Sequence, residues 1–205
     1  ASQKTGCFST YMRMIDEVRL WGLDVVMAGN IKGFLDRYAT AGGLIEEARA
    51  RGLDPVQCCG NTDGTKLNIE MALVANATGL LPSVPGMHGP RLDTVDDVLS
   101  AFDLATCRDP GVVDYILGAE PGGGVFVVGH SDHPMQADYL SYLKMGDGPD
   151  YLFYRPYHLC HLETPWAIAA AVCHGDGLMQ PWAGRISDVY AYAKRDIAAG
   201  EEVPY

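Results

Sequence analysis

Residues 61–71 have the sequence NTDGTKLNIEM, which predicts the beginning of a long helix. Asn61 or Thr62 can cap this helix, and the pattern continues to about Ala77, where Gly79 follows as a stop. One side of it is mostly apolar at spacings of 4, 3 and 4, through Leu67, Met71, Val74 and Thr78. We expect this side to lie against a core and to set the position of the polar residues beside it.

Three ionisable side chains stand at the start of this predicted helix. Asp63, Lys66 and Glu70 occupy positions i, i+3 and i+7, so they share one face. A lysine held near carboxylates can donate or accept a proton at a carbonyl or an alcohol, because its pKa responds to burial and to neighbouring charge. The alternative is an exposed Lys–Glu pair worth about 0.2–0.5 kcal/mol, and the spacing alone favours that alternative.

Helical and strand-like patterns follow one another along the rest of the chain and predict an α/β fold (α+β mixed) with a mixed sheet. The predicted helices cover residues 9–21, 41–52, 93–99 and 166–174, with Pro165 beginning the last of them. The predicted strands cover residues 24–29, 112–117, 125–128 and 151–155, and the Pro- and Gly-rich residues 79–91 form a loop. From Arg185 to Lys194 a strand-like pattern returns, which indicates a small appended β module.

The composition of the 205-residue chain is that of one or two globular domains, since 48% of the residues are hydrophobic and 20% are charged. The formal net charge of −11 argues against nucleic acid or an anionic membrane surface as the main partner, because both favour clustered Lys and Arg. No apolar run reaches the roughly 18 residues of a membrane-spanning helix. The six cysteines form no CxxC pair and are expected to be reduced thiols of a cytoplasmic protein.

A second group of polar residues follows the last predicted strand of the sheet. Arg155 and His158 could hold a phosphate or carboxylate group. His158 and His161 also form an HxxH pair with Glu163 nearby, which could bind a divalent metal, but hydrogen-bonded structural histidines are the commoner case. A similar loop at residues 130–133, with two histidines and an aspartate, is more typical of a solvated turn.

Asn30 and Lys32 follow the buried strand predicted at residues 24–29, and ligand contacts in α/β proteins are concentrated at such strand ends. Lys32 could meet an anionic group there, or it could be an ordinary surface lysine. The three glycines at residues 122–124 lack the GxGxxG spacing and the following helix of a phosphate loop, so they predict a turn between strands. No complete dinucleotide fingerprint occurs in the 205 residues.

Three segments resemble motifs of one enzyme family. Residues 61–80 (NTDGTKLNIEMALVANATGL) are similar to a helix of NAD(P)-dependent oxidoreductases that resemble homoserine dehydrogenase and carry a C-terminal SAF module. Some members of that family are called deoxyxylulose-phosphate-reductoisomerase-like. Residues 154–159 (YRPYHL) resemble a later motif of the same family, and residues 191–201 (AYAKRDIAAGE) resemble the opening of its SAF module. The three motifs occur in the family's order and span most of the chain.

The resemblance implies a parent protein of three parts: a Rossmann lobe, a catalytic α/β region and a SAF-like β module. Residues 1–30 would then be the tail of the Rossmann-like lobe, residues 31–184 the catalytic α/β domain, and residues 185–205 the start of the SAF-like module. The glycine-rich dinucleotide loop of the first part is missing from the sequence. We therefore expect this segment, taken alone, to bind NAD(P) weakly and to be inactive.

The resemblance also implies an activity, in which hydride passes between a nicotinamide and a small hydroxy- or keto-substrate that could be phosphorylated. Homoserine dehydrogenases use an Asp and a Lys on the corresponding helix for proton transfer. That pair is usually four residues apart, whereas Asp63 and Lys66 are three apart. Lys66 would be the general acid/base, and Asp63 and Glu70 would orient it or bind substrate. The substrate-binding residues would be Arg155, His158, Lys32 and Asn30.

Two alternatives remain open at this point. A reductoisomerase reaction would need a divalent metal or an equivalent electrophile to polarise the ketone, and the HxxH loops form no convincing cage for one. A non-catalytic ligand-binding or assembly domain could also be built on the same scaffold, because a fold does not determine a function. In either case we expect a small-molecule ligand and a homo-oligomer.

Overall fold

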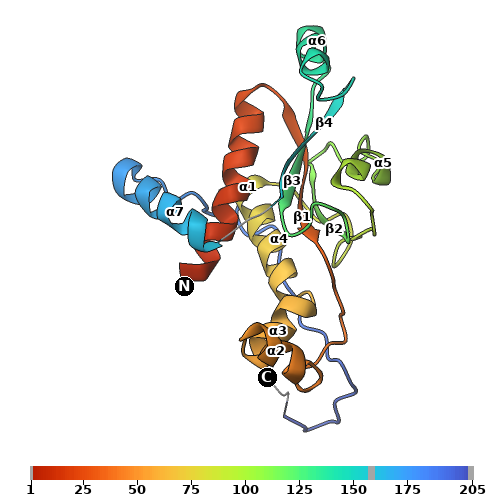
Figure 1. Ribbon diagram of the computed structural model, residues 1–205, viewed down its shortest axis with the longest axis vertical. Coiled ribbons are helices and arrows are strands. Elements are labelled where there is room, and N and C mark those ends of the chain that lie inside the picture. The colour runs from red at the N-terminus through yellow and green to blue at the C-terminus, as the bar shows by residue number, and fades with distance from the viewer. Residues whose placement is uncertain (1, 157–159, 203–205) are drawn as a thin grey trace.

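Four strands form a mixed sheet at the centre of the fold in the computed structural model, which describes residues 2–156 and 160–202 (Figure 1). They are β1 (Asp24–Lys32), β2 (Val112–Leu117), β3 (Val125–His130) and β4 (Asp150–Arg155). The order across the sheet is β2-β1-β3-β4, in which β1 and β2 are parallel and the other two neighbouring pairs are antiparallel. The predicted α/β fold with a mixed sheet is therefore confirmed.

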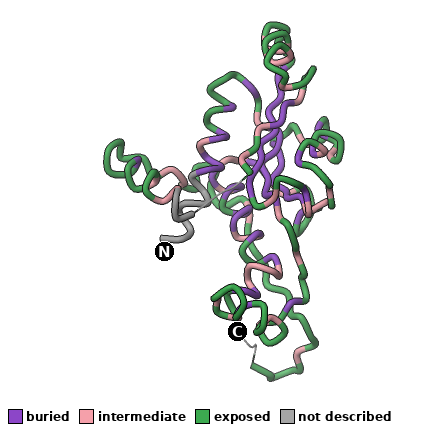
Figure 2. Tube along the Cα trace, viewed as in Figure 1, coloured by how far each residue is buried: buried purple, intermediate pink, exposed green. Residues whose placement is uncertain are grey.

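The strands β1, β2 and β3 are buried along most of their length, because other parts of the chain cover both faces of the sheet (Figure 2). Their near-continuous apolar sequences fit this two-sided burial. Gly29 in β1 lets the ring of Phe126 on β3 lie against the backbone, since a Cβ at Gly29 would stand 2.2 Å from Phe126 Cζ. The strand β1 runs on to Lys32, so Asn30 and Lys32 belong to it and not to a loop that follows it.

Two long helices, α1 (Ser2–Leu20) and α4 (Thr65–Thr78), cover one face of the sheet (Figure 1). The helix α1 buries Tyr11, Ile15 and Val18, whose spacing matches the predicted amphipathic pattern. The helix α4 buries the first three residues of its predicted apolar stripe. The opposite face is covered by the short helices η2 (Val95–Asp97) and α5 (Val98–Ala101). The sheet therefore separates two apolar cores, and α4 lies over the face that carries Asn30.

The single helix predicted over residues 61–77 is wrong, because the chain forms two helices in this region. The first, α3 (Pro55–Thr62), begins behind an Asp54 N-cap whose carboxylate accepts hydrogen bonds from amides of the first turn. Gly64 then adopts a φ of +91°, a left-handed conformation that separates α3 from α4. Asp63 therefore lies between the two helices and not on a face of α4.

The remaining helices lie around the sheet. η1 (Gly42–Leu44) and α2 (Ile45–Arg51) fall within the helix predicted at residues 41–52 and pack beside α3. The helix α6 (Pro134–Tyr142) was not predicted, and none of its residues is buried, so its sequence has no apolar stripe to reveal it. It projects from one end of the sheet (Figure 1).

The helix α7 (Cys160–His174) packs against α1 and extends away from the sheet (Figure 1). It begins before the predicted start at Trp166, and Pro165 lies inside it. Proline usually favours the first helical turn because it lacks an N–H group. Here the preceding turn is held from outside, since Glu163 is bound by Arg155 and Thr10.

Residues 175–202 form neither a helix nor a strand. The strand-like pattern predicted from Arg185 to Lys194 is therefore wrong: most of these side chains are exposed, and no sheet edge pairs with them. The helix α1 and most of β1, which lie within residues 1–30, share one core with later elements. Within the described ranges, no helix combines the length and the hydropathy needed to cross a membrane.

Candidate active site

A buried carboxylate links α4 to the central strand. The Glu70 side chain on α4 is only 6% exposed, and its Oε1 lies 3.4 Å from Nζ of Lys66, one turn earlier on the same helix. On the other side, Asn30 Nδ2 on β1 donates a hydrogen bond of 3.3 Å to Glu70 Oε2. The Lys66–Glu70 pair is thus more than an exposed surface pair. Its acid is buried and is held by groups from two elements.

Lys32 is a second amine near Lys66 and Glu70. It stands two residues after Asn30 on β1, so both side chains emerge on the same face of the sheet, and its Nζ donates a 2.6 Å hydrogen bond to the Asn61 carbonyl. Burial lowers the pKa of Lys32, and the positive charge of Lys66 lowers it further, while Glu70 and Asp63 act in the opposite direction. Lys32 therefore releases its proton more readily than an ordinary lysine.

Asp63 makes different contacts from those predicted. Its Oδ1 accepts a 2.9 Å hydrogen bond from the Thr65 amide at the start of α4, and its Oδ2 accepts a 2.7 Å hydrogen bond from Nζ of Lys194. Burial alone would raise the pKa of Asp63, but the hydrogen bonds from Lys194 and Thr65 outweigh burial and lower it. Asp63 therefore binds the first amide of α4 and holds the C-terminal segment.

Lys194, which binds Asp63, was not predicted from local sequence patterns. It lies 131 residues from Asp63 in the chain, within the segment that has no regular structure. Helical or strand periodicity cannot indicate such a contact, because it depends on how the segment folds back over α3. The one sequence signal for it is the resemblance of residues 191–201 to a family motif.

Arg155 lies on the same face of the sheet as Asn30. The two residues are aligned across β3 through Val125, and aligned residues on neighbouring strands point to the same face, about 10 Å apart over two strand spacings. The guanidinium of Arg155 is already paired with Glu163, with Nη1 3.2 Å from Oε1. An anionic ligand would have to compete with Glu163 for Arg155. His158, predicted as its companion, lies outside the described residues.

At the other end of the sheet, His130 is buried and paired with carboxylates. His130 is the last residue of β3, is buried, and pairs through Nδ1 with Asp150 Oδ1 at 2.8 Å. The predicted solvated turn is therefore wrong for His130, although the Asp132 side chain beside it is 80% exposed. Across the parts of the chain that the structure describes, no three His, Cys, Asp or Glu side chains are grouped so as to hold a metal ion.

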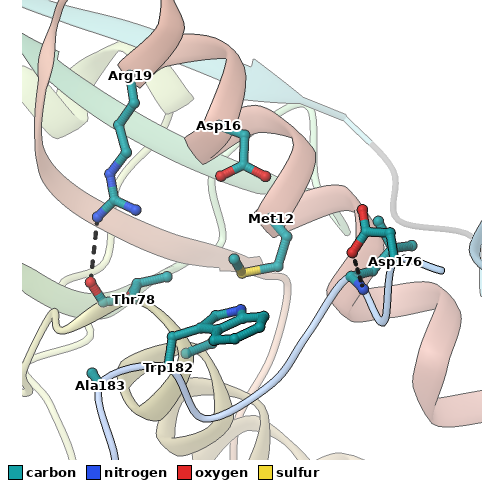
Figure 3. A pocket seen from close by; sticks show the side chains of 9 residues that line it. Met12, Asp16, Arg19, Thr78, Asp176, Trp182 and Ala183 are labelled. Atoms are coloured by element: carbon teal, nitrogen blue, oxygen red, sulfur yellow. Dashed lines mark hydrogen bonds between the residues drawn. The ribbon is translucent and has the colours of Figure 1, made fainter. Parts of the chain in front are cut away.

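A cavity of about 410 Å³ lies at the far end of α4, between α1 and the segment that follows α7 (Figure 3). It is lined in part by Met12, Asp16, Thr78 and Trp182, and Arg19 Nη2 donates a 3.3 Å hydrogen bond to the Thr78 carbonyl at its edge. The 14 residues of α4 span about 20 Å. This cavity is therefore separate from the Lys66–Glu70 pair at the other end of that helix.

Comparison with known proteins gives a family for the chain. No curated protein matches the sequence. The family model described as the catalytic domain of oxidoreductase DRL matches residues 9–164, which include the whole sheet together with Asn30, Lys32, Lys66 and Glu70. The match covers well over half of the sequence. The chain therefore belongs to the family of oxidoreductase DRL catalytic domains.

Proposed function

We propose that this oxidoreductase catalytic domain serves an NAD(P)-dependent reaction, in which hydride passes between a nicotinamide and a small hydroxy- or keto-substrate. The observation that carries the proposal is the buried Glu70 carboxylate, held by Lys66 and Asn30 with Lys32 beside them. A fixed carboxylate next to two amines, at the carboxyl end of a central strand, suits proton transfer at a substrate oxygen. The resemblance to homoserine-dehydrogenase-like enzymes supports the same class of substrate.

In the proposed chemistry, Lys66 transfers the proton to and from the substrate oxygen. In the direction of alcohol oxidation, Lys66 Nζ takes the hydroxyl proton, and in the reverse direction it returns a proton to the carbonyl oxygen. Glu70 keeps the amine in place through its 3.4 Å contact, and Asn30 fixes the other oxygen of Glu70. Lys32 supplies positive charge where the substrate oxygen becomes negative. The nicotinamide, when bound, supplies or accepts the hydride.

The glycine run at residues 122–124 does not form a phosphate loop for the dinucleotide. The glycine run at residues 122–124 packs against β4, since a Cβ at Gly124 would stand 1.8 Å from the Arg155 carbonyl oxygen. The run leads into the strand β3 and not into a helix, whose N-terminus would favour a pyrophosphate. We therefore assign no contact with NAD(P) to any described residue. These residues have roles in proton transfer and in substrate binding only.

Two lysines, Lys66 on α4 and Lys32 on β1, are the cations next to Glu70 that an anionic substrate group could meet. The Lys66 side chain is 46% exposed, whereas the Arg155 guanidinium is engaged by Glu163. Lys32 and Lys66 oppose each other electrostatically, so an anion between them would relieve that repulsion. We propose that a phosphate or carboxylate of the substrate binds toward these lysines. Arg155 would contribute after exchanging its partner.

Replacing Lys66 by alanine tests the proposal in the protein as the organism makes it. Turnover would be followed by nicotinamide absorbance over a panel of small hydroxy acids, keto acids and sugar phosphates. We expect Lys66→Ala to lower kcat by about 10²–10⁴-fold, the usual contribution of a general acid or base, while the Kd for NAD(P)H stays unchanged. Lys144→Ala, at an exposed lysine next to α6, is the matched control and should keep full turnover. Undiminished turnover in Lys66→Ala would remove Lys66 from the mechanism.

A further inference from the structure

Three reactive side chains meet between α3 and the C-terminal segment. Lys194 Nζ lies 3.7 Å from Cys59 Sγ and 2.7 Å from Asp63 Oδ2, and Cys59 Sγ lies 3.7 Å from the same Asp63 oxygen. The Ala39 carbonyl accepts hydrogen bonds from both the amine, at 2.5 Å, and the thiol, at 3.2 Å. We call Cys59, Asp63 and Lys194 the Cys–Asp–Lys cluster. None of these contacts is needed for the chemistry proposed at Lys66.

The cluster joins the helix α3 to a segment without helix or strand. Cys59 is buried on α3, at 8% exposure, whereas the Lys194 side chain is 33% exposed and belongs to a segment without helix or strand. The exposed part of Lys194 opens the cluster to solvent on one side. The amine and the thiol share Asp63 and the Ala39 carbonyl as acceptors, so their nitrogen and sulfur atoms are held side by side.

We propose that Cys59 and Lys194 form a covalent, oxygen-bridged cross-link, Sγ–O–Nζ, when the protein meets dioxygen. The thiol sulfur and the amine nitrogen each lose two electrons, and dioxygen takes up all four. One oxygen atom becomes the bridge, and the other leaves as water with two of the protons. A third proton, from the ammonium group, passes to Asp63 or to solvent. The S–H bond and two N–H bonds break, and one S–O bond and one N–O bond form.

The surroundings of Cys59 and Lys194 set the protonation state of the thiol and of the amine before the cross-link forms. Burial raises the pKa of the Cys59 thiol, although the charge of Lys194 acts in the opposite direction. Burial alone would lower the pKa of Lys194, but the hydrogen bond and charge of Asp63 outweigh it and raise the pKa. Both groups therefore hold their protons at neutral pH. Asp63, which contacts both atoms, is placed to accept one as the bonds form.

Mass spectrometry of the intact chain tests the proposal without any assay of activity. Protein kept in air-saturated buffer at alkaline pH should gain the mass of one oxygen atom and lose that of two hydrogen atoms. Proteolysis should then yield one peptide pair joined between Cys59 and Lys194, and dithiothreitol should restore the original mass. The cross-linked chain should also unfold at a higher temperature, because the link closes a long loop in the unfolded state.

Three variants separate this cross-link from other oxidation products. Lys194→Arg keeps the charge but cannot form the link, and Cys59→Ser removes the sulfur, so neither should show the mass change. Cys58→Ser, at the neighbouring buried cysteine, is the matched control and should still show it. A gain of whole oxygen atoms, a loss of two hydrogen atoms alone, no change in the wild type, or a joined peptide in Lys194→Arg would each overturn the proposal. Lys194 is partly exposed, so its variant tests the idea even if Cys59→Ser does not fold.

Discussion

Burying the Glu70 carboxylate costs free energy, and the neighbouring side chains compensate for this cost. A carboxylate that leaves water for a protein interior is destabilising by several kcal/mol unless hydrogen bonds and opposite charge compensate it. Asn30 and Lys66 supply this compensation from β1 and from α4. A stable fold alone could place an apolar side chain at this position at lower cost. A buried acid that contacts Lys66 and acts electrostatically on Lys32 therefore favours a role in binding or proton transfer.

The coupling between the two lysines gives a prediction at the same scale. Burial is the larger cause of the lowered pKa of Lys32, and the charge of Lys66 is the next. We expect Lys66→Gln to raise the pKa of Lys32 toward its ordinary value of 10.5, because the neighbouring positive charge is gone. NMR titration of labelled lysine side chains would measure the change. Lys144→Gln serves as the control, and an unchanged Lys32 in Lys66→Gln would show that the two amines do not interact.

The same pKa fixes the sign of a pH effect on stability. The folded state holds the Lys32 proton less tightly than the unfolded chain, so the unfolded chain binds more protons in the window between the two pKa values. The contribution of Lys32 to the free energy of unfolding therefore rises with pH as the pH approaches 10.5 from below. In Lys66→Gln this rise should become smaller, since the two pKa values move closer together.

Sequence reasoning reached part of the candidate site at this scale. Lys66 and Glu70 are one helical turn apart, and that local spacing survives the error in the start of the helix. Asn30 and Lys32 were expected near a ligand because they stand at a strand end, and β1 does end beside α4. The contact between Asp63 and Lys194 was not predictable in this way, because it depends on tertiary folding over 131 residues.

At the scale of elements, the boundary between α3 and α4 decides what Asp63 does. The pair Asp54-Pro55 is a strong N-terminal helix signal, and it begins α3 well before the predicted start at Asn61 or Thr62. Gly64, at a φ of +91°, then separates the helices. Sequence patterns indicate helix periodicity well but left-handed breaks poorly, because a glycine inside a helical pattern does not always end the helix. The prediction failed at this break.

Two substitutions at Asp63 separate the contribution of its hydrogen bond to Thr65 from the contribution of its charge. Asp63→Ala loses the bond to the Thr65 amide and the pair with Lys194, so we expect a stability loss of about 0.5–1.5 kcal/mol for the bond to Thr65 alone. Asp63→Asn keeps an acceptor for Thr65 and loses only the charge. Chemical denaturation of both variants beside the wild type would measure the difference. Equal losses would show that the hydrogen bond to Thr65 contributes nothing to stability.

The charge of Asp63 also makes the stability of the folded protein depend on pH. Its folded pKa lies below the ordinary 3.8, so its contribution is fully present above that value and is lost as the pH falls through the folded pKa. The wild type should therefore lose more stability on acidification in this window than Asp63→Asn. Parallel acid denaturation curves for the two proteins would contradict the assignment.

At the scale of the whole molecule, one side chain holds the C-terminal segment to the sheet-covering helix. Asn76 on α4 donates a 3.1 Å hydrogen bond from Nδ2 to the Ser187 carbonyl, and its Oδ1 accepts bonds of 2.9 Å from the amides of Ile186 and Ser187. Lys194 makes a second attachment at Asp63, near the other end of α4. The helix α4 is thus fixed on one side by β1 and on the other by an irregular segment.

Removing the Asn76 side chain should release this segment and leave the sheet intact. Asn76→Ala loses three hydrogen bonds, each worth about 0.5–1.5 kcal/mol, so amide exchange at Ile186 and Ser187 should become much faster while exchange in β1 and β3 stays slow. Asn76→Asp keeps the acceptor for both amides and loses only the donor, so it should fall between Asn76→Ala and the wild type. Hydrogen exchange followed by mass spectrometry would rank the three proteins. If Asn76→Ala kept wild-type protection at these amides, the segment would be held by other contacts, with Lys194 and Asp63 the first to examine.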